Sequence, residues 1–365
     1  MAGRMVAGHQ DPPKLMPLRL TREDILAFRR RVQALDERLP PGGYSLGRAA
    51  WAGLQDSVPR SALHSLHARV EGVAADAWED PAHAQVWGPR YTAFVVPADA
   101  HAAFTLARLP LKGRIRERAL DLATRVDAHL GGRRLPMDPV GEALGIHPNN
   151  LRYAALTGRI LVRWAGARQP TVWTVPPPAM EPMEALTELA RRYLHWYGPA
   201  TVSAFVRWGG IDAPAAITAF EGLRPLLVAV RTPLGEGWIL AEDEPIFRAR
   251  PTASPAAARL LPSGDPYFLL WNADRELLVA GAAHRAVLWP SRVWPGAVLV
   301  DGEIIGTWRR AKAVVEVTSW RELSPSERDA VEREAAGLPL PDVSVAPAVR
   351  WGIPQPTRSS TSRAG

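Results

Sequence analysis

The sequence predicts an α+β protein that is built from tandem winged helix-turn-helix units and a C-terminal β-rich domain. The order helix, glycine-containing turn, helix and strand pair recurs between residues 21 and 240. A Pro/Ala-rich linker at residues 251–258 then precedes several short segments of β type. These two observations set the class of fold and the order of its parts.

The same observations predict where the parts begin and end. Both ends of the chain are poor in apolar periodicity and are expected to be flexible. The expected parts are a flexible N-terminus at 1–17, a first winged-helix unit at 18–110, a second at 111–178, a third at 179–250, a β-rich domain at 259–341 and a flexible tail at 342–365.

The clearest unit is the second, because its apolar residues recur at helical spacing and glycines separate its helices. It is expected to contain a long helix (115–130), a short helix (138–144), a turn (145–148), a helix that Asn149 caps (150–156) and a strand pair (160–164 and 171–175). The strand pair is the predicted wing, and the helix before it has the place of a recognition helix.

The third and first units follow the same order less clearly. The third is expected to contain helices at 183–196, 201–208 and 215–223, the last capped by Asp212, and strands at 226–231 and 237–240. The first is expected to contain helices at 21–34, capped by Thr21, and at 61–70. Residues 39–59 leave its internal boundaries open.

The C-terminal domain is predicted from short apolar runs and one hairpin signal. Asp301-Gly302 between two such runs favours a two-residue β-turn. The expected strands are 267–271, 286–288, 297–300, 303–307 and 313–317, followed by a polar helix at 325–337.

The composition excludes several classes of chemistry. The chain has no cysteine, and its nine histidines lack the spacing of a metal site, so we expect neither a metal nor another cofactor. No run approaches the ~18 apolar residues that a membrane span requires, and no secretory signal is evident. These features predict a soluble, cytoplasmic protein that does not bind membranes.

The charge favours nucleic acid as a partner. The net charge is +7, and nearly all of the 44 basic residues are arginines, whose planar guanidinium suits phosphates and guanine edges. A general bias of the genome towards arginine would give the same composition. The candidate DNA contacts beside the predicted turns, wings and C-terminal hairpin are Arg152, Arg159, Arg163, Arg168, Arg207, Arg309 and Arg310. A solvated basic face is the alternative for these arginines, as packing at domain seams is for Trp164, Trp173 and Trp308, which could otherwise stack on bases.

Five segments carry a resemblance to a known family. They are Gly53-Leu54-Gln55-Asp56-Ser57, Leu66-His67-Ala68-Arg69-Val70, Val86-Trp87-Gly88-Pro89-Arg90, the segment 261–267 around Asp265, and the segment 295–308. The chain resembles the winged-helix superfamily that contains the AlkZ- and YcaQ-type DNA glycosylases. The resemblance implies three winged-helix units, a C-terminal barrel-like domain and a basic, concave surface for double-stranded DNA. Arg90 is expected near this surface, either as a phosphate contact or in a structural salt bridge. It also implies excision of alkylated bases or unhooking of interstrand crosslinks, without a metal.

The catalytic motif of the glycosylases that the chain resembles is Gln-x-Gln or Gln-x-Asp, and it is incomplete here. On the alignment of segment 66–70, Gln55 falls on the second motif position and Gly53 on the first. Asp56 is the other candidate, but neighbouring residues of a strand point to opposite faces, so Gln55 and Asp56 should not act side by side. Asp56 could instead cap a turn.

Two hypotheses therefore remain open at this level. The first is a monofunctional DNA glycosylase in which Gln55 and Asp56 are the catalytic candidates. The second is a non-catalytic DNA-binding protein, either a lesion sensor or a transcriptional regulator. In both cases the expected protein is monomeric, associates with the nucleoid and binds duplex DNA.

Overall fold

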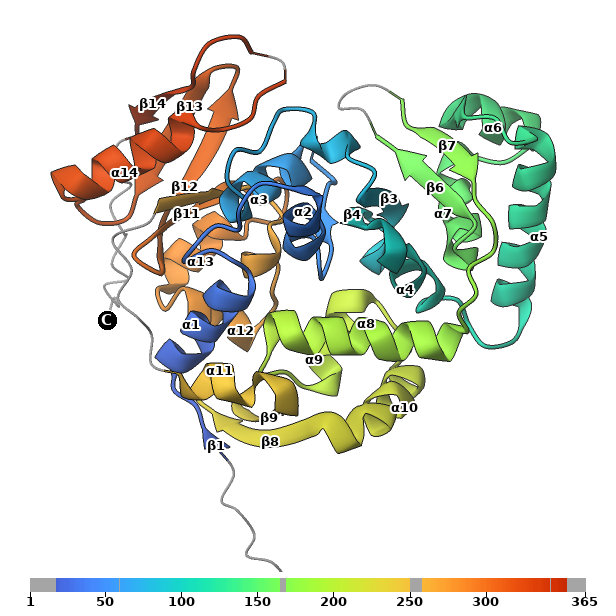
Figure 1. The fold of residues 1–365 in the computed structure, drawn as a ribbon, viewed down its shortest axis with the longest axis horizontal. Helices are drawn as coiled ribbons and strands as arrows, with labels where there is room; N and C mark the ends of the chain where they lie inside the picture. Colours follow the sequence, from blue (N-terminus) through green and yellow to red (C-terminus); the bar gives the residue numbers. More distant parts are fainter. Residues whose placement is uncertain (1–17, 59, 165–168, 250–257, 342, 353–365) are drawn as a thin grey trace, which may run out of the picture.

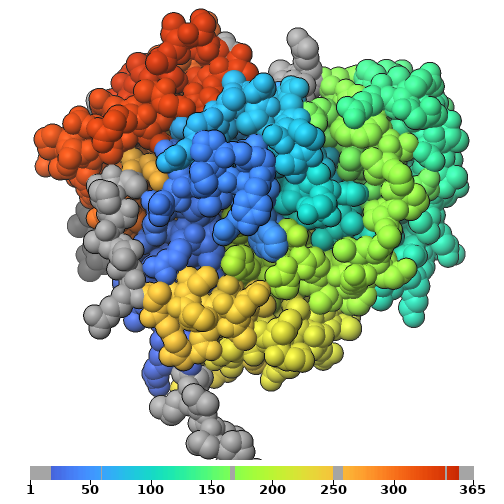
Figure 2. Space-filling model, viewed as in Figure 1, coloured from blue at the N-terminus to red at the C-terminus, as the bar shows by residue number. Residues whose placement is uncertain are grey.

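The computed structural model describes residues 18–58, 60–164, 169–249, 258–341 and 343–352. Figure 1 shows the C-terminal β-rich region (orange and red) at one end of the molecule and the second helical region (green) at the other. The first region (blue) lies between them, and Figure 2 shows the same order on the molecular surface. The model confirms the predicted α+β class.

The first region combines helices with a small antiparallel sheet of order β2-β4-β3. Its elements are α1 (Arg22–Val32), α2 (Gly43–Ala49), β2 (Leu54–Gln55), α3 (Ser61–Arg69), η1 (Ala77–Glu79), β3 (His83–Trp87), η2 (Pro89–Tyr91), β4 (Ala93–Pro97) and α4 (His101–Leu106). Thr21 caps α1 as predicted, through a capping box with Asp24. The elements α2 and β2, which no sequence pattern indicates, occupy part of the stretch 39–59. The preceding strand β1 (Leu18–Arg19) pairs with a strand of the third region.

The second region contains a helix-turn-helix and a three-stranded sheet of order β5-β7-β6. Its elements are α5 (Arg114–Leu130), β5 (Leu135–Pro136), α6 (Met137–Ala143), η4 (Pro148–Asn150), α7 (Leu151–Ala154), η5 (Ala155–Thr157), β6 (Ile160–Arg163) and β7 (Thr171–Thr174). The predicted cap at Asn149 is wrong. His147 precedes the first turn, and its ring nitrogen accepts from the backbone N–H of Asn149. The expected second helix is divided into one α-helical and two 3-10 segments.

The third region repeats the arrangement, with β8 between β1 and β9 in its sheet. Its elements are α8 (Pro182–Tyr197), α9 (Val202–Gly209), α10 (Ala213–Leu223), η6 (Arg224–Leu226), β8 (Leu227–Thr232), β9 (Gly235–Leu240), η7 (Ala241–Asp243) and α11 (Glu244–Arg248). Asp212 caps α10 as predicted, because its carboxylate accepts from the N–H of Ala215.

The C-terminal region is an open sheet, so the barrel-like expectation is wrong. Among the described residues its strands follow the order β10-β11-β12-β13-β14. Its elements are β10 (Ala258–Leu261), η8 (Pro266–Phe268), α12 (Ala273–Leu278), α13 (Ala282–Leu288), β11 (Gly296–Val300), β12 (Glu303–Ala311), β13 (Val314–Ser319), α14 (Pro325–Ala336) and β14 (Ala348–Trp351).

Two of the predicted C-terminal strands are wrong, and the hairpin between two others is right. Residues 267–271 include a 3-10 turn, and residues 286–288 end a helix. Both runs are apolar because they are buried, and burial alone does not distinguish a strand from a helix. Asp301 and Gly302 have φ of +49° and +79°, as a two-residue hairpin turn requires. Trp308 is buried and donates to the carbonyl of Leu261 at 2.8 Å, so it is not a surface for stacking bases.

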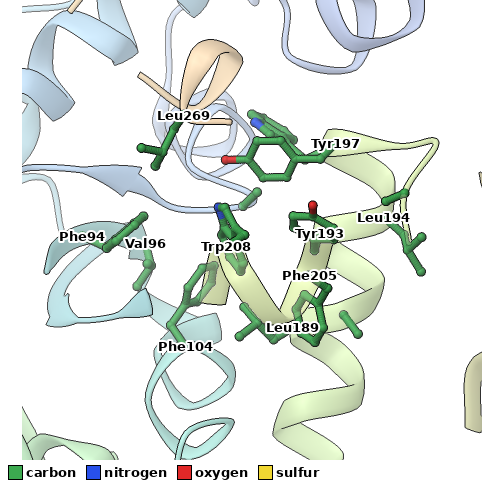
Figure 3. Packing of buried hydrophobic residues seen from close by; sticks show 14 of the residues in the cluster. Phe94, Val96, Phe104, Leu189, Tyr193, Leu194, Tyr197, Phe205, Trp208 and Leu269 are labelled. Atoms are coloured by element: carbon green, nitrogen blue, oxygen red, sulfur yellow. The ribbon is translucent and has the colours of Figure 1, made fainter. Parts of the chain in front are cut away.

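A single aromatic core joins the regions. Figure 3 shows Phe94 and Phe104 of the first region facing Trp208 and Tyr193 of the third, with Leu269 of the C-terminal region beside them. All of these side chains are almost fully buried. This core fixes the seam at which three regions of the chain meet.

Candidate functional site

A pocket of about 420 Å³ opens at this seam. Its wall is predominantly apolar and aromatic, with a few polar groups and arginines, as is usual for ligand sites. Its lining residues come from β2 and the segment after it, from the turn between β3 and β4, from α9 and from three C-terminal segments: Gln55, Ser57, Val58, Pro89, Arg90, Thr92, Phe94, Trp208, Ser263, Gly264, Leu269, Trp271, Arg292, Val293 and Trp294.

Gln55 lies on the wall of this pocket. Strand β2 pairs with β4, which places Gln55 opposite Phe94. The side-chain amide nitrogen of Gln55 donates to the hydroxyl of Ser57, and this contact leaves Oε1 as an acceptor. The amide also packs on Gly264, where a Cβ atom would lie 3.3 Å from Cδ of Gln55. The amide is therefore held from two sides.

Asp56 is buried beneath the pocket and is not among the residues that line it. One carboxylate oxygen accepts from the backbone N–H of Ala62 at 3.1 Å, and the other accepts from the amide of Gln85 at 2.7 Å. Burial raises the pKa of Asp56 to about 7, against the lowering effects of Ala62, Arg60 and Gln85. In this geometry the carboxylate binds the first turn of α3, and Gln55 alone of the two candidates faces the pocket.

Gly53 has no space for a side chain. Its φ is +81°, and a Cβ atom would lie 2.9 Å from ring carbons of both Phe94 and Phe104. L-residues rarely adopt such a backbone conformation. A glutamine at this position would require a rearrangement of the aromatic core.

Arg90 enters the pocket from a strained turn. Both Arg90 and Tyr91 have positive φ, at +56° and +58°, and such strain is typical of functional sites. The guanidinium of Arg90 lies 5.0 Å from the centre of the Trp271 ring. Arg90 and Arg292 are both exposed, and neither forms an ion pair with a residue that the structure describes. No Asp or Glu is among the described lining residues, so the pocket lining is positively charged.

The other arginines predicted to contact DNA are divided between the pocket and other places. The guanidinium of Arg152 lies 5.5 Å from the ring centre of Tyr91, the residue that follows Arg90. Arg309 donates to the carbonyl of Val293 in the pocket wall at 3.2 Å. Arg207 lines a neighbouring pocket that shares Trp208 and Trp271 with the first.

The remaining predicted arginines lie away from the pocket. Arg159 is bound to Asp127 in a 2.9 Å ion pair, and Arg163 stacks on Trp78. Arg310 donates to the carbonyl of Lys312 at the tip of the β12–β13 hairpin. Arg168 lies outside the described residues.

A buried ion pair fixes the wall behind Gln55. Arg69 of α3 and Asp265 are both fully buried, and they form two hydrogen bonds of 2.7 and 2.8 Å. Asp265 also accepts from Ser65 at 2.7 Å and from the backbone of Tyr267 at 2.9 Å. Because Asp265 follows Gly264 directly, this network positions the C-terminal segment against Gln55.

Sequence reasoning missed Trp271, Arg292 and Trp294. Trp271 ends the run 267–271, which the sequence pattern assigns to a strand and not to a site, and Arg292 and Trp294 lie in a segment without helical or strand periodicity. Only their place beside the C-terminal segments of the resemblance could have indicated them. Within the described part of the chain, no group of three or more His, Cys, Asp or Glu side chains could hold a metal ion. No described helix has the length and apolar character to cross a membrane.

The fold and this pocket define a protein of several winged-helix regions with a positively charged pocket at their seam. The chain belongs to the AlkZ-like DNA glycosylase family, because the family model described as DNA glycosylase AlkZ-like matches residues 46–339. The interstrand DNA cross-link repair glycosylase of Streptomyces sahachiroi is 30% identical over 160 residues, which cover 43% of this chain and 42% of that relative. The match thus spans less than half of the relative's length.

The solved structure of S. sahachiroi DNA glycosylase AlkZ has a similar fold. It matches with a TM-score of 0.74 over 92% of this chain and 100% of that chain, at 21% sequence identity. At this level of identity the likeness establishes the fold alone, and this chain shares that α+β fold.

Proposed function

We propose that this chain is a DNA-repair glycosylase that hydrolyses the N-glycosidic bond of an alkylated base. The observation that carries the proposal is the position of Gln55, whose amide is held on the wall of a largely apolar pocket with unpaired arginines. Membership of the AlkZ-like DNA glycosylase family supports it. The name of the S. sahachiroi relative extends the proposed substrates to DNA with interstrand crosslinks.

The chemistry requires little from the protein beyond placement. The bond between C1′ and the base nitrogen breaks, and its electron pair leaves with the base. An N-alkylated purine is already cationic, so it departs as a neutral molecule without a general acid. The sugar then develops the oxocarbenium character that is familiar from glycoside hydrolysis.

Gln55 would position the water that attacks this cation. Its Oε1 accepts a hydrogen bond from the water, whose oxygen bonds to C1′ and whose proton is released to solvent. No lysine is among the described residues of the pocket wall, and a lysine amine would be the nucleophile of a Schiff-base route. This favours direct hydrolysis, in which Asp56 supports the strand that carries Gln55.

Duplex DNA is the proposed partner. The target nucleotide must leave the base stack to reach the pocket. We assign contacts with the flanking phosphates to Arg90 and Arg292, because both are exposed arginines of the pocket lining. We extend the same role to Arg152, Arg207 and Arg309 around the seam. A monomer that works on the nucleoid belongs to the same proposal.

Release of an alkylated base from duplex DNA tests this function. The substrate is an oligonucleotide duplex with one N7-methylguanine, and excision is measured as alkali-labile strand breaks under single-turnover conditions. Gln55→Ala should reduce the rate at least tenfold, which corresponds to about 1.4 kcal/mol of transition-state stabilisation. Gln169→Ala, an exposed glutamine of the second region, is the matched control and should retain the rate. Equal rates for the wild type and Gln55→Ala would contradict the proposal.

A non-catalytic lesion sensor or regulator is the second candidate. The observation that favours it is Gly53, where the core excludes the first glutamine of the motif. Its signature in the same experiment is binding of the modified duplex without any release of base by the wild type.

A further inference from the structure

Arginine and tryptophan side chains gather at a second place, where the first region meets the wing of the second. This junction cluster consists of Arg60, Trp78, Arg134, Arg163 and Trp173. The guanidinium carbon of Arg60 lies 3.7 Å from the centre of the Trp78 ring, and that of Arg163 lies 5.0 Å from the same ring. Arg134 lies 4.4 Å from the ring centre of Trp173. The cluster is separate from the residues that line the pocket.

The arginines of the cluster are close to one another and are poorly neutralised. None of the three forms an ion pair with a residue that the structure describes. Burial is the main cause that lowers the pKa of Arg163. Glu79 raises this pKa, and the positive charges of Arg134 and Arg60 lower it further. Glu79 attracts both Arg60 and Arg163, and Asp56 also attracts Arg60. The three arginines still outnumber Glu79, the one exposed carboxylate that acts on them, so the cluster keeps a net positive charge at the surface. An anion bound between the arginines would neutralise this charge.

Stacking on tryptophan prepares these guanidinium groups for such an anion. A guanidinium that lies over an aromatic face keeps the N–H donors of its plane free, and these match the oxygens of a phosphate. Arg60 is also held by a 3.1 Å hydrogen bond to the carbonyl of Trp164. The cations are therefore ordered before a ligand arrives.

The cluster is connected to the wall of the pocket through one short segment. Ser57 and Val58 line the pocket, and Arg60 follows them in the chain. The amide of Gln85 provides a second connection, because it donates to Asp56 and accepts from the backbone N–H of Trp164. A ligand at the cluster would contact the same segment that positions Gln55.

We propose that the junction cluster binds the phosphate backbone of duplex DNA, as a contact site separate from the pocket. Phosphate groups attract several cations held close together, and contacts of this kind fix the register of a protein on duplex DNA. The inference relies on the proposed function only for the identity of the ligand as DNA. Arg60 and Arg134 extend the set of DNA-binding residues beyond the wing arginine Arg163.

The salt dependence of DNA binding tests this site without any need for catalysis. Fluorescence anisotropy with an unmodified duplex gives the slope of log K against log[salt], to which each neutralised phosphate contributes about −0.9. Arg60→Gln and Arg163→Gln should each reduce the magnitude of the slope by about one, and the double variant by about two. Arg125→Gln removes an exposed arginine of α5 and is the matched control.

The outcomes separate this inference from the proposed function. A double variant that folds as the wild type does, by circular dichroism and thermal melting, and keeps the wild-type slope would overturn the junction site. If a glutamine variant fails to fold, the double variant Arg60→Lys/Arg163→Lys keeps both charges but loses the planar, stacked guanidinium groups. It should bind the duplex more weakly than the wild type, and an unchanged affinity would overturn the junction site. The two proposals can also fail separately. If the arginine variants have a reduced slope but the wild type releases no base, the junction site is supported and the proposed glycosylase activity is refuted.

Discussion

The pocket seam and the second winged-helix region are built in contrasting ways. The second region has its own apolar core, in which Val126, Leu130, Ile160 and Val172 come from segments close in sequence. The seam is assembled from residues that are distant in sequence, such as Gln55, Trp208 and Trp271.

The second region and the seam also differ in how their arginines are paired. In the second region the predicted DNA contact Arg159 is neutralised by Asp127, at 2.9 Å. At the seam, Arg90 has no ion-pair partner among the described residues and lies in a strained turn. Arg134 and Arg163 of the second region also lack an ion pair with a described residue, and they lie where its wing meets the first region. The seam differs because it combines unpaired charge with a strained turn. This contrast teaches that the winged-helix pattern predicts the individual regions, whereas the candidate functional residues lie at the junctions between regions.

The largest expected effect comes from breaking the buried ion pair of the seam. Asp265→Ala leaves Arg69 charged and without its partner in the core, which should cost about 3–5 kcal/mol of unfolding free energy. Asp127→Ala removes the partner of Arg159 at a partly exposed site and should cost less than about 1 kcal/mol. Urea denaturation of both variants measures the two changes. Similar losses of unfolding free energy in the two variants would show that the Arg69–Asp265 ion pair does not stabilise the seam.

The helices, caps and turns of the winged-helix regions could be predicted because each is specified by neighbouring residues in the sequence. Helix α5, the cap at Asp212 and the turn at Asp301-Gly302 each follow from residues within a few positions of one another. The barrel-like form came from the resemblance alone, because strand segments in a sequence indicate a sheet without indicating how its edges end.

The site could be predicted only in part. The alternation of a strand correctly separates Gln55 from Asp56, and the structure places one at the pocket and the other beneath it. The contacts of Gln55 with Gly264, and of Arg90 with Trp271, join residues roughly 200 positions apart. No periodicity or motif spacing reports such a pairing, since tertiary packing alone creates it.

The titration of Asp56 should give the seam a pH dependence. Its pKa is about 7 in the folded protein against the ordinary value of 3.8, because burial penalises the charged form. The folded state therefore binds the proton more tightly than the unfolded state. The stabilisation is complete below pH 3.8 and is lost as pH rises towards about 7. Because the shift spans about three pH units, the whole decline should be about 4 kcal/mol, at up to about 1.4 kcal/mol per pH unit.

Denaturation at a series of pH values in this window checks the assignment. Asp56→Asn carries no titrating group and should flatten the decline of unfolding free energy. Gln85→Ala removes a hydrogen bond to the carboxylate that lowers its pKa, so the decline should extend to higher pH. An unchanged slope in Asp56→Asn would assign the pH dependence to another group.

The smallest expected effect compares one glycine from each region. Gly53→Ala adds a Cβ atom 2.9 Å from two phenylalanine rings at φ of +81°, and should cost about 2–3 kcal/mol. Gly145→Ala has a similar φ of +67° but meets no atom within 4 Å, so only the backbone cost of about 1 kcal/mol remains. Both variants incur the cost of an alanine at positive φ, so the difference between their unfolding free energies measures the packing against the aromatic core. Equal destabilisation in thermal or urea unfolding would mean that the aromatic core moves aside, and a side chain at position 53 could then approach the pocket.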